Sequence, residues 1–285
     1  MNVNKFTSWE DAVAWLITQP DQQELVRACY FDRPALSAAQ RYSQSDEWFA
    51  VRELLPANIG SVLDVGAGMG IASYALSMDG WQVTALEPDP SHLVGAGAIR
   101  KLASEAGLEI TVIEIWAEGL PFADDSFDII HARQVLHHAR NLGQFCKELH
   151  RVLKPGGRLI ATREHVISHA SQLPKFLAKH PLHDLYGGEN AFQRDEYLAC
   201  LNSAGFYIQH VIGPWDSIIN STPFTRHKLS ELFLERFGYW LGASIISRII
   251  FSEVGFKFTR RILALIDRRP GRLYTFVVGK LDNTK

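Results

Sequence analysis

The chain has 285 residues, a net charge of −2 and a pI near 6.6, with 47% apolar and 21% charged residues. This composition is sufficient for a packed core and excludes a disordered or collagen-like chain. The near-neutral charge disfavours a nucleic-acid-binding protein, because phosphate contacts usually require a basic surface. The three cysteines, Cys29, Cys146 and Cys200, form no Cys-x-x-Cys pair, which is typical of a protein in a reducing cytosol.

No signal peptide or membrane-spanning segment is predicted. Glu10 and Asp11 occupy the place where a signal peptide would have its apolar stretch. The most apolar later segment, 241–256, is interrupted by Arg248 and Glu253. It therefore falls short of the roughly 18–20 apolar residues that span a bilayer. We expect a soluble, cytoplasmic protein.

The first 56 residues are predicted to be helical. Apolar residues follow Ser8 at helical spacing, and Asp11 completes a weak capping box. A second helical pattern covers 39–55 and stops at Pro56. We expect residues 1–56 to form an N-terminal helical cap.

From Ser61 to about Thr162, short apolar runs alternate with helical patterns, which is typical of βαβ units and a parallel sheet. The predicted strands are 61–65, 82–86, 109–115, 127–132 and 158–162. The predicted helices between them are 69–78, 91–106 and 141–153.

The remainder of the chain is predicted to combine two further strands with helical segments. A loop-and-helix region, 165–190, is followed by a helix at 191–203 and by strand-like runs at 206–212 and 273–278. The stretch between those runs, 213–272, reads as a helical insertion. We expect its helices to bury eight apolar residues, Leu229, Leu232, Phe233, Ile249, Ile250, Ile262, Leu265 and Ile266.

A glycine-rich turn follows the first predicted strand. Asp64 is followed by glycines at 66, 68 and 70, after which a helical pattern begins. Glycines at such a turn let the backbone approach a ligand where a Cβ atom would clash. The next strand ends at Glu87, about twenty residues beyond Gly66, where a carboxylate can accept hydrogen bonds from the ribose of an adenosine-containing cofactor.

The details of the turn favour S-adenosylmethionine over a dinucleotide. The dinucleotide motif requires a third glycine at position 71, which is Ile71 here. Asp64 would repel a pyrophosphate but attract the ammonium group of a bound amino acid. No tyrosine has a lysine four residues later, so the Tyr-x-x-x-Lys pair of short-chain dehydrogenases is missing. An NAD-linked oxidoreductase remains the alternative enzyme.

Four sequence blocks carry a family resemblance. They are Leu63-Asp64-Val65-Gly66-Ala67-Gly68-Met69-Gly70, Leu86-Glu87-Pro88, the run from Ala117 to Asp128, and Arg151-Val152-Leu153-Lys154-Pro155-Gly156-Gly157-Arg158-Leu159. In this order they resemble the class I S-adenosylmethionine-dependent methyltransferases, and most of all the small-molecule branch related to ubiquinone/menaquinone methyltransferases.

The resemblance implies a role for particular residues. Asp64, Gly66, Ala67 and Gly68 would face the methionine part of S-adenosyl-L-methionine, and Glu87 with Pro88 would hold the ribose. Ala117 and Glu118 would flank the adenine, although this chain has Trp116 where the family often has an aspartate. Further residues are expected to cover the cofactor, namely Arg133 and Gln134 after the fourth strand and Arg41 and Tyr42 in the N-terminal helices.

The family fold is an α/β, Rossmann-like sheet of seven mostly parallel strands in the order 3-2-1-4-5-7-6, with the last strand antiparallel. The resemblance therefore implies a methyltransferase domain at 57–285, with its cofactor-binding core at 60–165. The region 165–190 and the insertion 213–272, which lies between strands 6 and 7, would roof the substrate side of the sheet.

Methyl transfer requires orientation and a dry pocket, and a hydroxyl acceptor also requires a base. His165 is the first candidate base and His138 the second, because both follow predicted strands. No metal site is predicted. The His165-x-x-x-His169 and His180-x-x-His183 spacings lack cysteines and paired carboxylates.

The acceptor is expected to be a small molecule, methylated on oxygen or carbon. A basic C-terminal stretch, which includes Arg268, Arg269 and Arg272, suits a phosphorylated sugar or a lipid headgroup. The apolar insertion beside it suits a hydrophobic acceptor or peripheral membrane contact. A non-catalytic cofactor-binding scaffold remains the alternative outside the enzymes, and the oligomeric state stays open.

Overall fold

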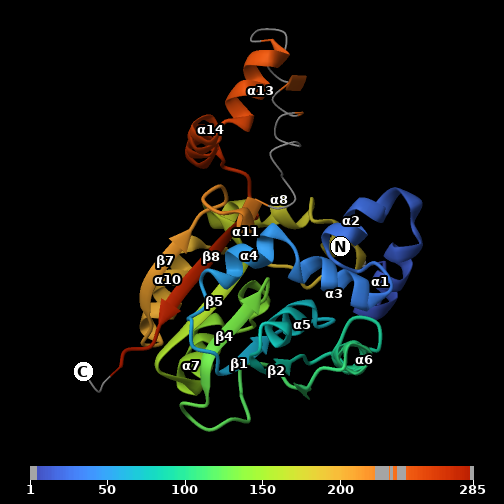
Figure 1. Ribbon diagram of the computed structural model, residues 1–285, viewed down its shortest axis with the longest axis vertical. Coiled ribbons are helices and arrows are strands. Elements are labelled where there is room, and N and C mark those ends of the chain that lie inside the picture. The colour runs from blue at the N-terminus through green and yellow to red at the C-terminus, as the bar shows by residue number, and fades with distance from the viewer. Residues whose placement is uncertain (1–4, 222–230, 232–233, 236–241, 283–285) are drawn as a thin grey trace.

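A computed structural model describes residues 5–221, 231, 234–235 and 242–282 (Figure 1). A single sheet forms its centre, with the strand order β3-β2-β1-β4-β5-β8-β7. The strands are β1 Ser61–Val65, β2 Gln82–Leu86, β3 Ile110–Ile113, β4 Phe127–Arg133, β5 Leu153–Ile167, β6 Phe192–Gln193, β7 Tyr207–Ile212 and β8 Arg272–Gly279. The predicted order is confirmed, and the two-residue strand β6 beside β5 is an addition to it.

The sheet has the predicted directions. β1 pairs in parallel with both β2 and β4, whereas β8 is antiparallel to its neighbours β5 and β7. The carboxyl ends of β1, β2, β4 and β5 therefore meet at one edge of the sheet. In an open α/β sheet this edge is where ligands bind.

Helices cover both faces of the sheet. The longer helices are α1 Trp9–Thr18, α2 Gln23–Ala28, α3 Ala35–Ser43, α4 Asp46–Arg52, α5 Ile71–Met78, α6 Ala96–Ala106, α7 Leu142–Val152, α10 Arg194–Ser203, α13 Ala243–Phe251 and α14 Glu253–Ile266. The short helical segments are η1 Pro20–Gln22, η2 Leu136–His138, η3 Ala170–Gln172, α8 Leu173–Leu177, α9 Pro181–Leu185 and α11 Ile218–Ser221. One core cluster joins α7 and α10 to the sheet, and another joins α3, α4, α5 and α6 to the opposite face (Figure 1).

The N-terminal helices differ from the prediction in one place. The predicted helix over 39–55 is two helices, α3 and α4, and the first begins at Ala35. The break follows from Ser45, which has extended backbone and accepts a hydrogen bond from the Trp48 N–H, so that it caps the second helix.

The helix predicted at 91–106 begins only at Ala96, because the side chains of Asp89 and Ser91 form turns with the backbone before it.

A buried ion-pair network attaches α4 to the sheet. The Glu47 carboxylate accepts a hydrogen bond from Arg133 Nε at 2.8 Å, and Arg163 Nη1 lies 3.5 Å from it. Burial disfavours the charged carboxylate, but Arg133 and Arg163 outweigh it and hold the pKa of Glu47 below its ordinary value. The network thereby fixes the N-terminal helices above the ends of β4 and β5.

The insertion between β7 and β8 contradicts the prediction that its apolar residues are buried. Ile249, Ile262, Leu265 and Ile266 are exposed, and Leu265 retains 72% of its surface. The cause is visible in Figure 1, where α13 and α14 project away from the body of the domain. The other predicted residues, Leu229, Leu232, Phe233 and the side chain of Ile250, lie outside the described part of the chain.

None of the helices in the described ranges is long and apolar enough to cross a lipid bilayer.

Candidate active site

The glycine-rich turn after β1 has the backbone that its glycines allow. Gly66 and Gly68 have φ values of +60° and +56°, in the left-handed region that disfavours side chains. The Ala67 N–H donates to the Leu86 carbonyl at 3.0 Å, and the Gly68 N–H donates to Glu87 Oε2 at 2.8 Å. The turn is therefore held against the end of β2, and Glu87 supports it directly.

Glu87 has an unusual environment for a carboxylate. It is 8% exposed and also accepts a hydrogen bond from the Asp89 N–H at 3.0 Å. Burial raises the pKa of Glu87 to about 7 despite these two hydrogen bonds. The carboxylate has lone pairs left for a ligand, because each oxygen accepts one backbone hydrogen bond.

Asp64 lies below the turn, with both carboxylate oxygens in use. Oδ1 lies 2.8 Å from His131 Nδ1, and Oδ2 accepts a hydrogen bond from Ser73 Oγ at 2.6 Å. These partners fix the side chain at the carboxyl end of β1, where it supplies negative charge to the space beside the turn.

A cavity of about 260 Å³ lies against the turn, and we call it the glycine-loop cavity. It includes predicted site residues from the ends of β1 and β4: Asp64, Gly66, Ala67, Gly68, Arg133, Gln134 and His138. Residues that the sequence did not indicate complete its wall: Trp9, Leu25, Cys29 and Phe31 from the N-terminal segment and His180, Pro181, Leu182 and Glu189 from the region before β6. Apart from His180, which the sequence shows only as part of a His-x-x-His spacing, no motif marks these residues, since the fold brings them to the cavity from distant segments.

The remaining predicted cofactor residues do not line this cavity, and these include Glu87 and Pro88 at the end of β2. The Glu118 carboxylate accepts a hydrogen bond from the Arg140 N–H, and Ala117 packs into the core. Tyr42 is fully buried beside Tyr30 and Trp48, and Arg41 pairs with Asp32 at 2.6 Å.

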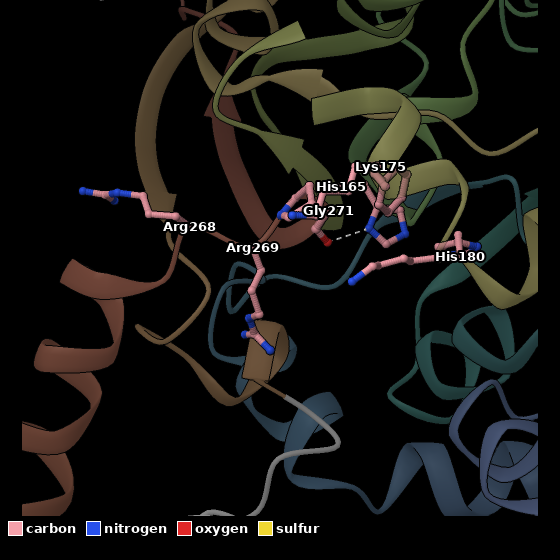
Figure 2. Close-up of a pocket in the computed structure, with 9 residues that line it drawn as sticks. His165, Lys175, His180, Arg268, Arg269 and Gly271 are labelled. Atoms are coloured by element: carbon pink, nitrogen blue, oxygen red, sulfur yellow. Dashed lines mark hydrogen bonds between the residues drawn. The ribbon is translucent and has the colours of Figure 1, made fainter. Parts of the chain in front are cut away.

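A second cavity, of about 610 Å³, opens beside the first, and we call it the cationic cavity. Its wall contains Lys175, Lys179, Arg268, Arg269, His165 and His180, together with Phe176, Pro270 and Gly271. Figure 2 shows residues 268 and 269 on the segment that leads into β8, and Lys175 and His180 on the segment after β5. Arg269 pairs with Asp267, whereas Lys175, Lys179 and Arg268 have no ion pair within the described residues. The cavity therefore suits an anion.

Both predicted bases lie near these cavities, with defined orientations. His138 lines the glycine-loop cavity, and its Nδ1 bonds to the Gly188 carbonyl at 3.0 Å. His165 lines the cationic cavity, and its Nδ1 bonds to the Gly271 carbonyl at 3.0 Å (Figure 2). Because a carbonyl only accepts, each Nδ1 carries the proton and each Nε2 keeps its lone pair.

The charges around these histidines differ. Burial lowers the pKa of His138 and of His165, and the nearby His137 lowers both further. For His137, burial opposes the charged form, but the Glu164 carboxylate at 2.7 Å outweighs it and raises the pKa to about 9. For Glu189, burial is outweighed by His137 and His180, and the pKa falls to about 2. His138 and His165 are therefore neutral at pH 7.

Comparisons with known proteins agree with this geometry. Residues 63–161 match a family model described as a methyltransferase domain. The chain is 26% identical over 162 residues to a ubiquinone biosynthesis O-methyltransferase of Agrobacterium fabrum, covering 55% of this chain and 64% of the relative. Other curated relatives are matched over about half of their length or less.

Solved structures share the fold. The geranyl diphosphate C-methyltransferase of Streptomyces coelicolor superimposes with a TM-score of 0.59 at 15% identity, covering 94% of this chain and 88% of that protein. The [4+2]-cyclase SpnF superimposes with a TM-score of 0.56 at 22% identity, covering 86% of this chain and 81% of that protein.

Residues 63–161 match a methyltransferase domain, and the strand order and the glycine-rich turn are those expected of the class I S-adenosylmethionine-dependent methyltransferases. The cofactor of this domain is S-adenosyl-L-methionine. None of these findings supports the NAD-linked alternative. The fold alone does not determine the reaction, since a cyclase shares it.

Proposed function

We propose that the protein transfers the methyl group of S-adenosylmethionine to the oxygen or carbon of a small-molecule acceptor. The observation that carries the proposal is the glycine-loop cavity, which is lined by Asp64 of β1 and by the glycine-rich turn that Glu87, just after β2, holds in place. Asp64 supplies the negative field for the cationic part of the donor, Gly66, Ala67 and Gly68 allow close approach, and Glu87 with Pro88 holds the ribose.

The adenine is assigned to the neighbourhood of Ala117 and Glu118. The Trp116 ring beside them is 54% exposed, with the Arg140 guanidinium 4.8 Å from its centre. Residues 1–56 act as a cap in this proposal, because Trp9, Leu25, Cys29 and Phe31 supply one wall of the cavity. That wall would exclude water from the methyl group during transfer.

The acceptor is proposed to carry a phosphate or another anionic group. Lys175, Lys179 and Arg268 in the cationic cavity supply the charge that such a group requires. His180 lines both cavities, so an acceptor held in one would reach the donor in the other. The geranyl diphosphate in the Streptomyces enzyme is an acceptor of this general kind.

For a hydroxyl acceptor, the proton is proposed to pass to an imidazole Nε2. His138 is favoured by its place in the glycine-loop cavity, and His165 is the second candidate because it lines the cationic cavity. In either case the acceptor oxygen attacks the methyl carbon as the carbon–sulfur bond breaks, and S-adenosylhomocysteine leaves.

The test is to incubate the purified protein with methyl-labelled donor and metabolite fractions, and to identify labelled products by mass spectrometry. The proposal expects a labelled product that contains an anionic group. The amount of this product should be lower with Lys175→Ala/Lys179→Ala, and no product should form with Gly68→Asp. Binding of the donor without turnover across a broad panel would instead favour the non-catalytic scaffold.

A further inference from the structure

A cluster of imidazole and carboxylate groups lies at the boundary between the two cavities. His137 belongs to η2, His165 to β5, and Glu189 to the segment before β6. One ligand atom of each lies within 4.8 Å of the other two, and His137 Nε2 is 3.7 Å from Glu189 Oε2. His180 adjoins the cluster, with Nε2 3.9 Å from the same carboxylate oxygen. We call these four residues the histidine cluster.

Groups behind two of the imidazoles fix their orientation. Glu164 bonds to His137 Nδ1 at 2.7 Å, and its oxygens also accept hydrogen bonds from the backbone N–H groups of Val135, Leu136 and His137. The Gly271 carbonyl accepts from His165 Nδ1. Histidines that bind metals are held in this way, with a carboxylate or carbonyl on the nitrogen that does not bind the ion.

Two buried polar atoms of the histidine cluster have no hydrogen-bond partner. The Glu189 side chain is 10% exposed, and its Oε2 atom is buried without a hydrogen bond. His180 Nδ1 is also buried without a partner. Within the described ranges, no lysine or arginine lies within 4.0 Å of the carboxylate of Glu164 or Glu189. The imidazole of His137 is the group that faces both buried carboxylates, and a divalent ion in place of its proton would compensate the two negative charges more fully.

We propose that His137, His165 and Glu189 bind a divalent transition-metal ion such as Zn²⁺, with His180 as a fourth ligand. Metal–ligand bonds of about 2.0–2.1 Å place tetrahedral ligand atoms about 3.3 Å apart. The separations of 3.7 and 3.9 Å from Glu189 to His137 and His180 therefore require small side-chain movements, and the separations that involve His165, within 4.8 Å, require closing by at most about 1.5 Å. A set of imidazoles with one carboxylate suits Zn²⁺ and its neighbours better than Mg²⁺ or Ca²⁺.

This site differs from both histidine pairs that the sequence displays. Only His165 of the first pair and His180 of the second belong to the cluster, and His169 is exposed. The sequence spacing within those pairs therefore could not predict the proposed metal site, because its ligands come from three separate segments. A metal-bound His165 leaves His138 as the candidate base.

The position of the site gives the ion a role, and this part rests on the proposed function. His165 and His180 line the cationic cavity, whereas His137, His180 and Glu189 line the glycine-loop cavity. An acceptor oxygen could therefore become a further ligand of the ion while it faces the methyl donor.

The test uses the full-length protein after treatment with a chelator. Calorimetry with Zn²⁺ is expected to give one ion per chain, and Co²⁺ is expected to give the visible absorption of a tetrahedral site. X-ray absorption of the Zn²⁺-loaded wild type should show mainly imidazole nitrogen around the ion. Wild-type protein that gives neither stoichiometric binding nor imidazole ligation would overturn the proposal.

Variants then locate the ion. Glu189→Gln and His137→Ala should abolish stoichiometric binding, and Glu164→Gln should weaken it about 10- to 100-fold through the loss of its support of His137. His169→Ala is the matched control, and it should bind as the wild type does. Binding unchanged in Glu189→Gln and His137→Ala would refute the site. Calorimetry with S-adenosylhomocysteine on the same samples is the second measurement. Binding of this nucleoside by a variant shows that the variant is folded, and it tests the cofactor site independently of the metal site.

Discussion

Replacing Glu47 by glutamine tests the physical account of how the N-terminal helices are attached. The substitution keeps the shape of the side chain but removes the charge that faces Arg133 at 2.8 Å and Arg163 at 3.5 Å. The Arg133 and Arg163 side chains are only 13% and 9% exposed, so both positive charges would remain in a poorly solvated place after the loss of the Glu47 charge. Breaking a buried ion pair by removing one partner costs about 3–5 kcal/mol.

The effect is measured by chemical denaturation and by thermal unfolding. A loss of about 3–5 kcal/mol corresponds to a decrease in Tm of roughly 6–10 °C for a chain of this size. Glu53→Gln, at an exposed position nearby, is the control and should change the free energy of unfolding by less than about 0.5 kcal/mol. Equal stabilities of the two variants would refute the reasoning.

The same comparison has a defined pH dependence. The folded-state pKa of Glu47 lies below the ordinary value of 4.5, so its contribution to stability is present above about pH 4.5. That contribution is lost as the pH falls through the folded-state pKa. The difference between the wild type and Glu47→Gln should therefore be largest near neutral pH and shrink in acid.

Three further predictions concern the cavity and the insertion. Gly66→Ala should destabilise the fold more than Gly68→Ala in denaturant titrations. A Cβ added at Gly66 would lie 2.7 Å from Val135 Cγ2, whereas one added at Gly68 would meet nothing within 4 Å. The left-handed backbone costs both variants about 1–2 kcal/mol, and equal losses of unfolding free energy would contradict the prediction. The proposed function has the ionised Glu87 carboxylate accept the ribose hydrogen bonds. Because its pKa is about 7, affinity for S-adenosylhomocysteine should then fall about tenfold from pH 8 to pH 6. Calorimetry of Glu87→Gln should show an affinity that does not change with pH, and the same slope in both proteins would exclude Glu87 as the titrating group. In a flotation assay the protein should float with vesicles that contain anionic lipid, since α14 exposes Val254, Phe258 and Leu265 near basic residues. Phe258→Asp should reduce the fraction of protein that floats. Absence of flotation by the wild type would exclude membrane contact.

The sequence predicted the central sheet well, for a physical reason. β1, β2 and β4 are short apolar runs that end at polar or glycine-rich turns, so their positions are encoded locally. The turn at Gly66 and Gly68 was recognisable because only glycine tolerates that backbone at low cost.

Other features depend on contacts that no local pattern encodes. The histidine cluster joins His137, His165 and Glu189, which are separated by 28 and 24 residues along the chain. The apolar residues of α13 and α14 indicated amphipathic helices but not what those helices pack against. Periodicity predicts that an apolar face exists, whereas burial depends on the position of the whole segment.

The central claim is that the glycine-loop cavity binds the methyl donor, and calorimetry with S-adenosylmethionine and S-adenosylhomocysteine tests it most directly. The account predicts saturable binding of both at one molecule per chain, weakened about 10- to 100-fold by Glu87→Gln at pH 8 through the loss of charge-assisted hydrogen bonds. No heat with either nucleoside, or unchanged affinity in Glu87→Gln, would contradict it.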